Sequence, residues 1–369
     1  MLTRLKNNPL APALVTGLTL AVYVLVVILQ AGGDPLALAR IGTRFSEGDP
    51  QGSEGYDGQF VVYIANDPQP NSVAEHLDVP AYRYQRILLP LLARLLAGGA
   101  AGRIPWALAV LGVVTQTLGT WAVAALLRRW NINPWYALVY GLWAGFVLAV
   151  RLDLPEPLAY GLVAAALLAV DDERHVLASM LLTMAIFTKD VVLPFAGALG
   201  LVYLWRREWR RAIGLAFVAG LPFAIFQFWL WQVFGAPGLG SGGAYATPFE
   251  WIPFMGLLRL GYYDPSLLLV YLVVFGPSII LPTVWGLVAA GRKLLAGDVN
   301  VWTLGLVLMT LSVIVLPFST FAEPGGLLRY ACGLMLAGLL FAARYQHRKA
   351  LRYAPLWLVM NAILWAGAG

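Results

Sequence analysis

Residues 11–31 read APALVTGLTLAVYVLVVILQA, a stretch in which no side chain is charged. A helix of about 20 apolar residues crosses the roughly 30 Å hydrocarbon core of a bilayer, so this stretch predicts a transmembrane helix. The rest of the chain has the same character, because 60% of its 369 residues are apolar and only 12% are charged. The composition therefore predicts an all-α polytopic membrane protein.

Further apolar stretches recur to the end of the chain. They predict about eleven transmembrane helices, at residues 11–31, 105–127, 134–150, 155–170, 176–187, 191–205, 212–234, 265–290, 301–317, 327–343 and 353–368. Several of these are too short to cross a bilayer without packed neighbours. Because no internal repeat and no appended soluble domain interrupts the series, residues 1–369 are expected to form a single integral membrane domain.

The basic residues indicate how the spans are oriented. If the N-terminus with Arg4 and Lys6 is cytoplasmic, every second connection is cytoplasmic too, and the positive-inside rule expects basic residues there. Those connections hold Arg128, Arg129, Arg174, Arg206, Arg207, Arg210, Arg211, Arg292, Lys293, Arg344, Arg348, Lys349 and Arg352. The net charge of +6 therefore reflects membrane orientation. Nucleic-acid binding is not predicted, since no basic stripe alternates with aromatic residues on a soluble face.

The first stretch also has the features of a cleaved signal peptide, with Arg4 and Lys6 before it and Ala31, Gly32 and Gly33 after it. Its apolar core is longer than the roughly 7 to 15 residues of a signal core, which favours a retained span. The one cysteine, Cys332, lies within a predicted span and excludes an intramolecular disulfide.

A long polar segment, residues 32–104, forms the first predicted extracytoplasmic loop. Its centre, residues 45–60, reads FSEGDPQGSEGYDGQF, in which acids alternate with aromatic residues. Gly55 and Gly58 bracket Tyr56 and Asp57, and such glycines let a carboxylate project from a tight bend. A solvated acidic loop is the simpler interpretation, but the interleaved aromatic residues favour a packed element with a functional carboxylate.

The second half of this loop contains residues 80–94, PAYRYQRILLPLLAR. From Tyr84 onward a helix would place Arg83, Arg86 and Arg94 near one face and leucines opposite, which predicts an interfacial amphipathic helix. Arginines at an interface often only reach lipid phosphates, an interpretation that suits Arg94. Arg83 and Arg86 are better candidates for a ligand site, because a guanidinium binds phosphate through two parallel hydrogen bonds.

Charges at the mouths of spans are costly unless they are paired or functional. The predicted extracytoplasmic ends of later spans carry Asp153, Glu156, Lys189, Asp190, Glu323 and Arg329. Structural alternatives exist, because Asp153 and Glu156 have capping-box spacing and Lys189 and Asp190 can pair with each other or cap a helix. All of these groups are expected on the same face as Asp57.

The second predicted extracytoplasmic loop, residues 235–263, contains the glycine-rich run GLGSGG at residues 238–243. This run lacks the Lys-Ser/Thr ending and the strand-to-helix context of a phosphate loop, so nucleotide binding is not predicted and a mobile cover over the site is the alternative. A histidine-rich metal site is not predicted, because His175 and His347 fall on the opposite side from His76. A divalent cation held by extracytoplasmic carboxylates is an open alternative.

Three motifs carry a resemblance to a known family: residues 55–59 (GYDGQ), residues 82–90 (YRYQRILLP) and residues 187–194 (FTKDVVLP). They resemble elements of bacterial members of the GT-C superfamily of integral membrane glycosyltransferases. Those proteins have a long first extracytoplasmic loop with an early aspartate, and a Lys-Glu or Arg-Glu element at a later span junction, where this chain has Asp190. The resemblance implies a GT-C-like fold in the bacterial plasma membrane, with a cytoplasmic N-terminus and an extracytoplasmic active site.

The resemblance also implies a function. GT-C enzymes typically transfer a sugar with inversion from a polyprenyl-phosphate donor to a glycan, lipid or protein acceptor, among membrane lipids. Asp57 would be the general base. The residues implied to bind the donor phosphate are Arg83, Arg86, Lys189 and Arg329. Those implied to bind the sugar or acceptor are Asp49, Glu54, Tyr56, Gln59, Asp153, Glu156 and Asp190. The resemblance implies no certain cofactor. The divalent cation named above is an open alternative.

Two other classes of protein compete with this hypothesis. A secondary transporter or flippase would also need many spans, but it usually has two related halves and ionisable groups near the membrane midplane. A noncatalytic assembly subunit would not need an acid-rich loop. Because the charges here crowd the predicted extracytoplasmic ends, the glycosyltransferase hypothesis is favoured.

Overall fold

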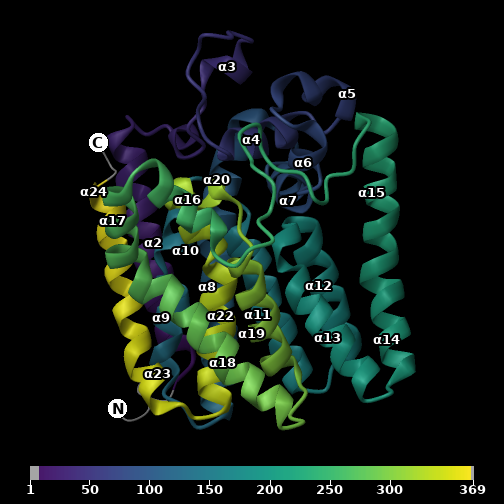
Figure 1. The fold of residues 1–369 in the computed structure, drawn as a ribbon. Coiled ribbons are helices and arrows are strands. Elements are labelled where there is room, and N and C mark those ends of the chain that lie inside the picture. The colour runs from purple at the N-terminus through teal and green to yellow at the C-terminus, as the bar shows by residue number, and fades with distance from the viewer. Residues whose placement is uncertain (1–7, 367–369) are drawn as a thin grey trace.

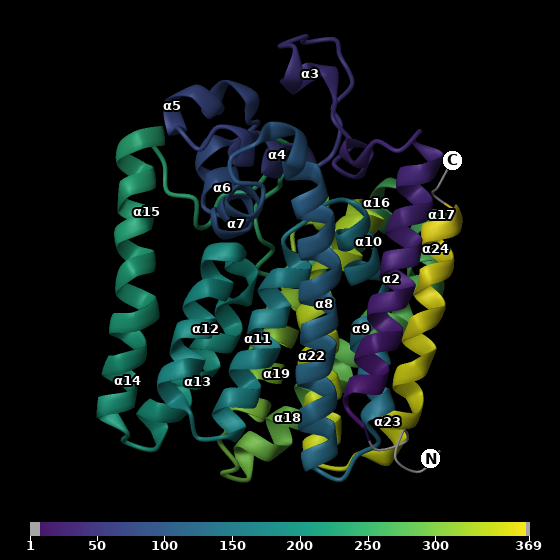
Figure 2. The same cartoon turned by 180° about the vertical axis from the view of Figure 1, so that it is seen from behind.

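The computed structural model describes residues 8–366, and every regular element in that range is helical. Figure 1 shows upright helices side by side, with a layer of short helices across one end. From behind, α8 (Ile104–Arg129) stands in the middle, with α2 (Leu10–Gln30) on one side and the α12 to α15 group on the other (Figure 2). The predicted all-α class is confirmed.

Five continuous helical segments are long and apolar enough to cross a membrane. They are α2; the segment Ala101–Arg129 that ends in α8; α14 (Trp209–Leu215) continued by the π-helical turn η6 (Ala216–Gly220) and α15 (Leu221–Phe234); α17 (Pro265–Phe275) continued by η7 (Gly276–Ile280) and α18 (Leu281–Leu295); and α21 (Pro324–Tyr330) with α22 (Cys332–Arg344). Each coincides with a predicted span, so the chain is a membrane protein by the length and composition of its helices.

The other six predicted spans are shorter or interrupted. They correspond to η4 (Pro134–Tyr136) with α9 (Ala137–Gly141) and α10 (Ala144–Arg151); α11 (Glu156–Asp171); α12 (His175–Thr188); η5 (Asp190–Val192) with α13 (Leu193–Trp205); α19 (Val301–Ile314); and α23 (Arg348–Tyr353) with η8 (Ala354–Met360) and α24 (Asn361–Ala366). Residues 1–7 and 367–369 lie outside the described range, which includes Arg4, Lys6 and the end of the last predicted span. The count of eleven stays a prediction.

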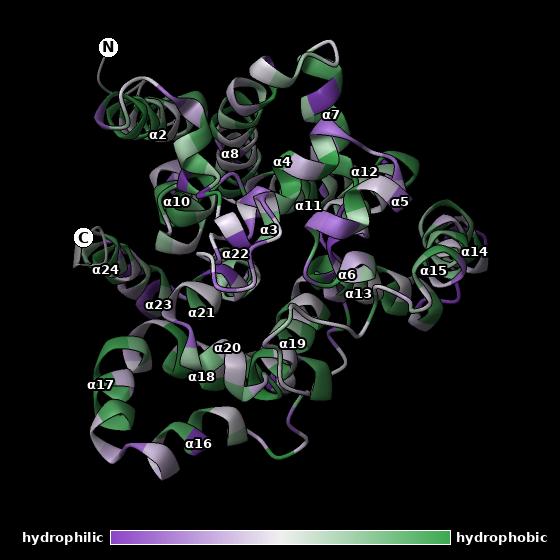
Figure 3. Ribbon diagram, turned by 90° about the horizontal axis from the view of Figure 1, so that it is seen from above, coloured by the Kyte–Doolittle hydropathy of each residue, from purple (hydrophilic) through white to green (hydrophobic). Residues whose placement is uncertain are grey.

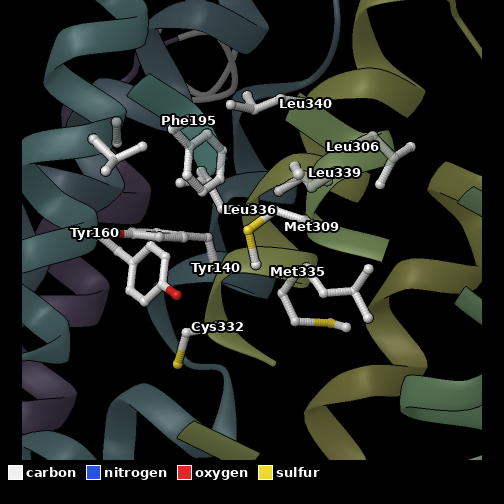
Figure 4. Close-up of a cluster of buried hydrophobic side chains, with 14 of the residues drawn as sticks. Tyr140, Tyr160, Phe195, Leu306, Met309, Cys332, Met335, Leu336, Leu339 and Leu340 are labelled. Atoms are coloured by element: carbon white, nitrogen blue, oxygen red, sulfur yellow. The ribbon is translucent and has the colours of Figure 1, made fainter. Parts of the chain in front are cut away.

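Helix α22 is the centre of the bundle. In the most apolar part of the segment that contains α22, 89% of the residues are buried. The corresponding share is 28% in the peripheral segment from α14 to α15. Figure 4 shows Met335, Leu336 and Leu339 of α22 beside Leu306 and Met309 of α19. Gly333 lets α22 come close to α19, because a Cβ there would lie 2.5 Å from Cε of Met309. Such small residues are common between helices in membranes. The peripheral helices instead expose large apolar side chains, as a lipid-facing surface requires.

The first predicted loop folds into short helices that cover one end of the bundle. They are η1 (Pro35–Leu38), α3 (Thr43–Ser46), α4 (Gly58–Asn66), α5 (Pro70–Val73), η2 (Ala74–His76), α6 (Pro80–Tyr84) and α7 (Leu88–Leu96). The amphipathic helix expected from Tyr84 onward begins only at Leu88, because α6 ends first and the chain bends between them. Arg94 does not extend toward lipid, since its Nη1 donates to the carbonyl oxygens of Ala65 and Asn66 at the end of α4.

Charge is separated between the two ends of the bundle. The α13 to α14 connection, the end of α18 and the α22 to α23 connection, all rich in arginine, lie at the end opposite the short helices (Figure 1). Viewed from the end that carries the short helices, hydrophilic segments occur around α3 and α6, while green apolar helices such as α15 form the periphery (Figure 3). This separation is what the positive-inside argument requires, and the compartment of each end stays a prediction.

One helix contact at this end depends on a glycine. A Cβ on Gly145 of α10 would lie 2.1 Å from the carbonyl oxygen of Leu328 in α21. Trp143 Nε1 donates to that same oxygen at 2.9 Å. The backbones of α10 and α21 are therefore in direct contact, and α21 carries Arg329.

We predict that Gly145→Ala lowers stability by about 1–3 kcal/mol, because the added methyl group must push α21 away. Thermal unfolding of the purified protein in detergent measures the effect. Gly291→Ala in α18 is the matched control, since no atom lies within 4 Å of its Cβ position. Equal melting temperatures for Gly145→Ala and wild type would contradict the close contact.

Candidate functional site

Asp57 stands immediately before α4, on a backbone that two glycines hold in place. Gly55 has a φ of +69°, in the region that favours glycine. A Cβ on Gly58 would lie 2.2 Å from the carbonyl oxygen of Leu152, in the turn before α11. The start of α4 therefore rests directly on the backbone between α10 and α11.

The carboxylate of Asp57 lies between two arginines. Arg83 Nη1 is 2.9 Å from Oδ1, and Arg329 Nη1 donates to Oδ2 at 2.8 Å. Burial alone would raise the pKa of Asp57, but the two guanidinium groups outweigh it and hold that pKa well below the usual range of a carboxyl group. Asp57 is thus a carboxylate, with a weak tendency to accept a proton while both arginines hold it.

Arg329 joins Asp57 to a second buried ion pair. Glu156 has no exposed surface, and Lys189 Nζ forms an ion pair with its Oε1. Arg329 Nη1 lies 3.7 Å from the same oxygen. The capping interpretation of Glu156 is wrong, because no side chain caps α11. Lys189 pairs with Glu156 and does not pair with its neighbour Asp190.

A third pair completes the group. Arg86 Nη2 lies 3.6 Å from Asp190 Oδ1. Arg86, Arg83, Asp57 and Arg329 line one small cavity. The structure thus brings together all four predicted phosphate-binding residues with Asp57. We call this the charged cluster, made of Asp57, Asp78, Arg83, Arg86, Glu156, Lys189, Asp190 and Arg329.

Asp78 is a member of the cluster that the sequence did not single out as a site residue. Its two oxygens accept from Arg83 Nε at 2.7 Å and Nη2 at 2.8 Å, a bidentate pair. It also accepts from the backbone N–H of Ala244 at 3.1 Å. The short spacing of five residues from Asp78 to Arg83 is the signal that could have indicated this pair.

Glu323 lies at the edge of the cluster and was noted in the sequence only as a charge at a span end. Its Oε1 accepts from the hydroxyl of Tyr56 at 2.6 Å and lies 3.5 Å from Arg329 Nη2. Burial raises the pKa of Tyr56, so its hydroxyl stays a neutral donor. The Glu323 side chain is 51% exposed, so it faces the aqueous mouth of the site.

Four predicted sugar or acceptor residues lie apart from the cluster. Asp49 is exposed and accepts from Gln51 N in a turn. Glu54 pairs with Arg44 at 2.6 Å, and Gln59 braces the loop by accepting from Gly42 N and donating to Glu54 O.

Asp153 is the fourth. It is buried, has a φ of +53° and has no hydrogen-bond partner for either oxygen among the described residues. Burial raises its pKa well above the ordinary value, which favours the protonated form. Asp153 is not an N-cap of α11 either, because Pro155 occupies that position.

The space inside the site is small. The cavity between Asp57, Arg83, Arg86 and Arg329 has a volume of about 20 Å³, enough for about one water molecule. Residues 235–254, between α15 and α16 (Met255–Tyr263), run beside α6 (Figure 1), where a Cβ on Gly238 would lie 2.7 Å from the carbonyl oxygen of Ala81. Tyr245 in this segment contacts Glu54 and accepts from Arg44 Nη1 at 3.1 Å.

Metal ligands do not gather here. In residues 8–366 no three His, Cys, Asp or Glu side chains are grouped to hold a metal ion. His76 Nδ1 lies 2.8 Å from the carbonyl oxygen of Phe45, outside the charged cluster.

Comparison of this chain with protein-family models, with curated protein sequences and with solved structures finds no match.

We predict that Lys189→Met lowers stability by about 3–5 kcal/mol, because it leaves the buried Glu156 carboxylate with only the 3.7 Å contact to Arg329. Adding Glu156→Gln should recover part of the loss, which unfolding of both variants in detergent measures. Arg211→Met is the control, because its pair with Glu208 is exposed and worth about 0–1 kcal/mol. Strictly additive effects of the two buried substitutions would contradict a direct pair.

We also predict that Tyr245→Phe loosens residues 235–254, since it removes the hydroxyl that contacts Glu54 and Arg44. A lost hydrogen bond of about 1 kcal/mol should increase amide hydrogen exchange in this segment by about fivefold. Tyr262→Phe, at an 86% exposed tyrosine, is the control. Unchanged exchange in Tyr245→Phe would show that this hydroxyl does not fasten the segment.

Proposed function

We propose that this protein is an integral membrane glycosyltransferase of GT-C type, which transfers a sugar with inversion from a polyprenyl-phosphate donor to an acceptor hydroxyl. The observation that supports it most is the position of Asp57. Its carboxylate lies between Arg83 and Arg329 at the end of a membrane bundle, with Arg86 and Lys189 beside them. The site therefore combines a proton acceptor with cations suited to a phosphate leaving group.

The donors of Arg86 support a phosphate ligand. Arg86 is 9% exposed, and its Nε has no acceptor among the described residues. Buried donors are nearly always satisfied, so the orphaned donor of Arg86, a residue that lines the cavity, suggests that a ligand oxygen belongs there. Phosphate oxygens suit a guanidinium best.

An apolar cavity supports a lipid carrier for that phosphate. It has a volume of about 500 Å³ and lies between α12, α13, α14, η6 and the start of α15. All of its lining residues are apolar, from Ile186 in the last turn of α12 to Phe223 in α15. Lys189 follows α12 directly, so a hydrocarbon chain in this cavity would place its phosphate end toward the cluster. A soluble sugar nucleotide would have no use for such a cavity.

The reaction is a single displacement. The acceptor oxygen attacks the anomeric carbon, its proton passes to Asp57, and the bond from the anomeric carbon to the phosphate oxygen breaks with both electrons remaining on that oxygen. The four basic side chains stabilise the charge that grows on the leaving phosphate. Because one displacement occurs at one carbon, the configuration inverts.

The distribution of charge supports an extracytoplasmic location for the proposed active site. The arginine-rich end of the bundle would face the cytoplasm and the charged cluster would open outside it, at the surface of a bacterial plasma membrane. Acceptors there are glycans, lipids or protein hydroxyls of the cell envelope. A divalent cation would act as a further ligand of the donor, through exposed carboxylates such as Glu323.

We predict that Asp57→Asn reduces sugar transfer by about 10²- to 10⁴-fold, the usual contribution of a general base, without loss of donor binding. Transfer of radiolabelled sugar from polyprenyl-phosphate donors into lipid or glycan products measures this. Glu47→Gln, an exposed acid on the same loop, is the control. Full transfer by Asp57→Asn would remove Asp57 from the mechanism. Donor movement across sealed vesicles without covalent change would replace the enzyme by a flippase.

A further inference from the structure

Asp57 is the most accessible carboxylate of the charged cluster. Its side chain is 27% exposed, against 15% for Asp190, 7% for Asp78 and none for Glu156. An anion that enters from the aqueous mouth therefore meets Asp57 before the other three carboxylates. If any carboxylate exchanges its partners with a ligand, the geometry favours this one.

The contacts of Asp57 with the two arginines can be exchanged for contacts with a ligand. Each of its oxygens meets one nitrogen, Nη1 of Arg83 and Nη1 of Arg329. Asp78, by contrast, binds Arg83 through a bidentate pair, which is the stronger geometry. The contacts of Asp57 are the ones that a phosphate oxygen can replace singly.

The two arginines stay in position without Asp57. Asp78 holds Nε and Nη2 of Arg83 and leaves Nη1 free to change partner. Arg329 keeps its Nε contact with Gly325 O at 3.3 Å and its ionic contacts with Glu156 and Glu323. A ligand therefore finds both Nη1 groups already directed into the cavity.

The charges of the cluster balance. Arg83, Arg86, Lys189 and Arg329 carry four positive charges, and Asp57, Asp78, Glu156 and Asp190 carry four negative charges. Because these eight groups store no excess positive charge, a bound anion must take guanidinium contacts from a carboxylate that already holds them. Glu323 at the edge of the cluster is more exposed, but it reaches only Arg329, at 3.5 Å, whereas Asp57 contacts both Arg83 and Arg329. Asp57 is therefore the carboxylate whose two contacts a singly charged anion would replace.

We propose that Asp57 is an internal counter-ion, and that the singly charged phosphodiester of a lipid-linked sugar replaces it on Arg83 and Arg329. This inference rests on the proposed function for its donor and adds the charge class and the order of events. A lipid diphosphate, which carries more negative charge, fits this neutral cluster less well. The donor binds first, because the carboxylate becomes available only after the exchange.

The exchange prepares both halves of the reaction. Released from two guanidinium groups, Asp57 regains the ordinary basicity of a carboxylate and takes the proton of the acceptor hydroxyl. The same two guanidinium groups now stabilise the second negative charge that the phosphate gains when its bond to the anomeric carbon breaks. Without a donor, Asp57 is paired and no proton is taken.

Binding of two probes to the purified full chain tests this inference without any sugar transfer. The probes are methyl farnesyl phosphate, a singly charged diester, and farnesyl diphosphate. Wild type should bind the diester more tightly than the diphosphate. Asp57→Asn should tighten diester binding by about tenfold, equivalent to about 1.4 kcal/mol, because the competing carboxylate is gone. Glu47→Gln removes an equal charge from the same loop and should leave binding unchanged.

Weaker or unchanged diester binding by Asp57→Asn would overturn the exchange, and tighter binding of the diphosphate by wild type would overturn the charge assignment. If Asp57→Asn is unstable alone, the diester should raise its melting temperature more than that of wild type, and failure to do so also counts against the exchange. The proposed function fails separately, if wild type transfers no sugar while Asp57→Asn still binds the diester more tightly.

Discussion

A charged side chain can leave water only when a partner comes with it, and the end of the bundle that carries the short helices is built on that constraint. Burial of an ion costs several kcal/mol unless an opposite charge is in reach. Glu156 begins α11, Lys189 follows α12 and Arg329 ends α21, so their pairing requires three helix ends to meet. Apolar packing alone cannot specify this meeting, because lipid tails are as apolar as the side chains between helices.

The backbone contacts around the cluster make the pairing possible. Gly58 lets the start of α4 rest on Leu152 O, and Gly145 lets α10 rest on Leu328 O. Each contact lies next to a charged residue of the site, Asp57 in the first case and Arg329 in the second. Larger side chains at these glycines would move a carboxylate or a guanidinium by more than a hydrogen bond tolerates. The geometry of the charged cluster therefore requires glycine at both positions.

The sequence revealed what is local. Apolar runs predicted the helical class. The arginine cluster of the first loop and the basic residues at later span ends pointed to Arg83, Arg86, Lys189 and Arg329, which do lie together. The sequence could not reveal which charged residues form ion pairs, because the partners are far apart along the chain. Lys189 is 33 positions from Glu156, and Arg329 is 272 positions from Asp57. Local spacing suggested the wrong partner for Lys189. Short helices such as α9 and α10 were read as one span, because an apolar run does not show where tertiary contacts break it.

Asp78 would keep Arg83 in place if residues 235–254 moved away from the charged cluster. Its two oxygens accept from Arg83, and one of them also accepts from the backbone N–H of Ala244 in residues 235–254. This side chain therefore connects residues 235–254 to Arg83. The bond from Ala244 is a single contact of 3.1 Å with a neutral donor, whereas Arg83 is held by two shorter bonds in a bidentate ion pair. If residues 235–254 moved away, the single contact would be the one to break. Arg83 would keep both bonds to Asp78 and stay at the cavity, whose volume of about 20 Å³ holds about one water molecule.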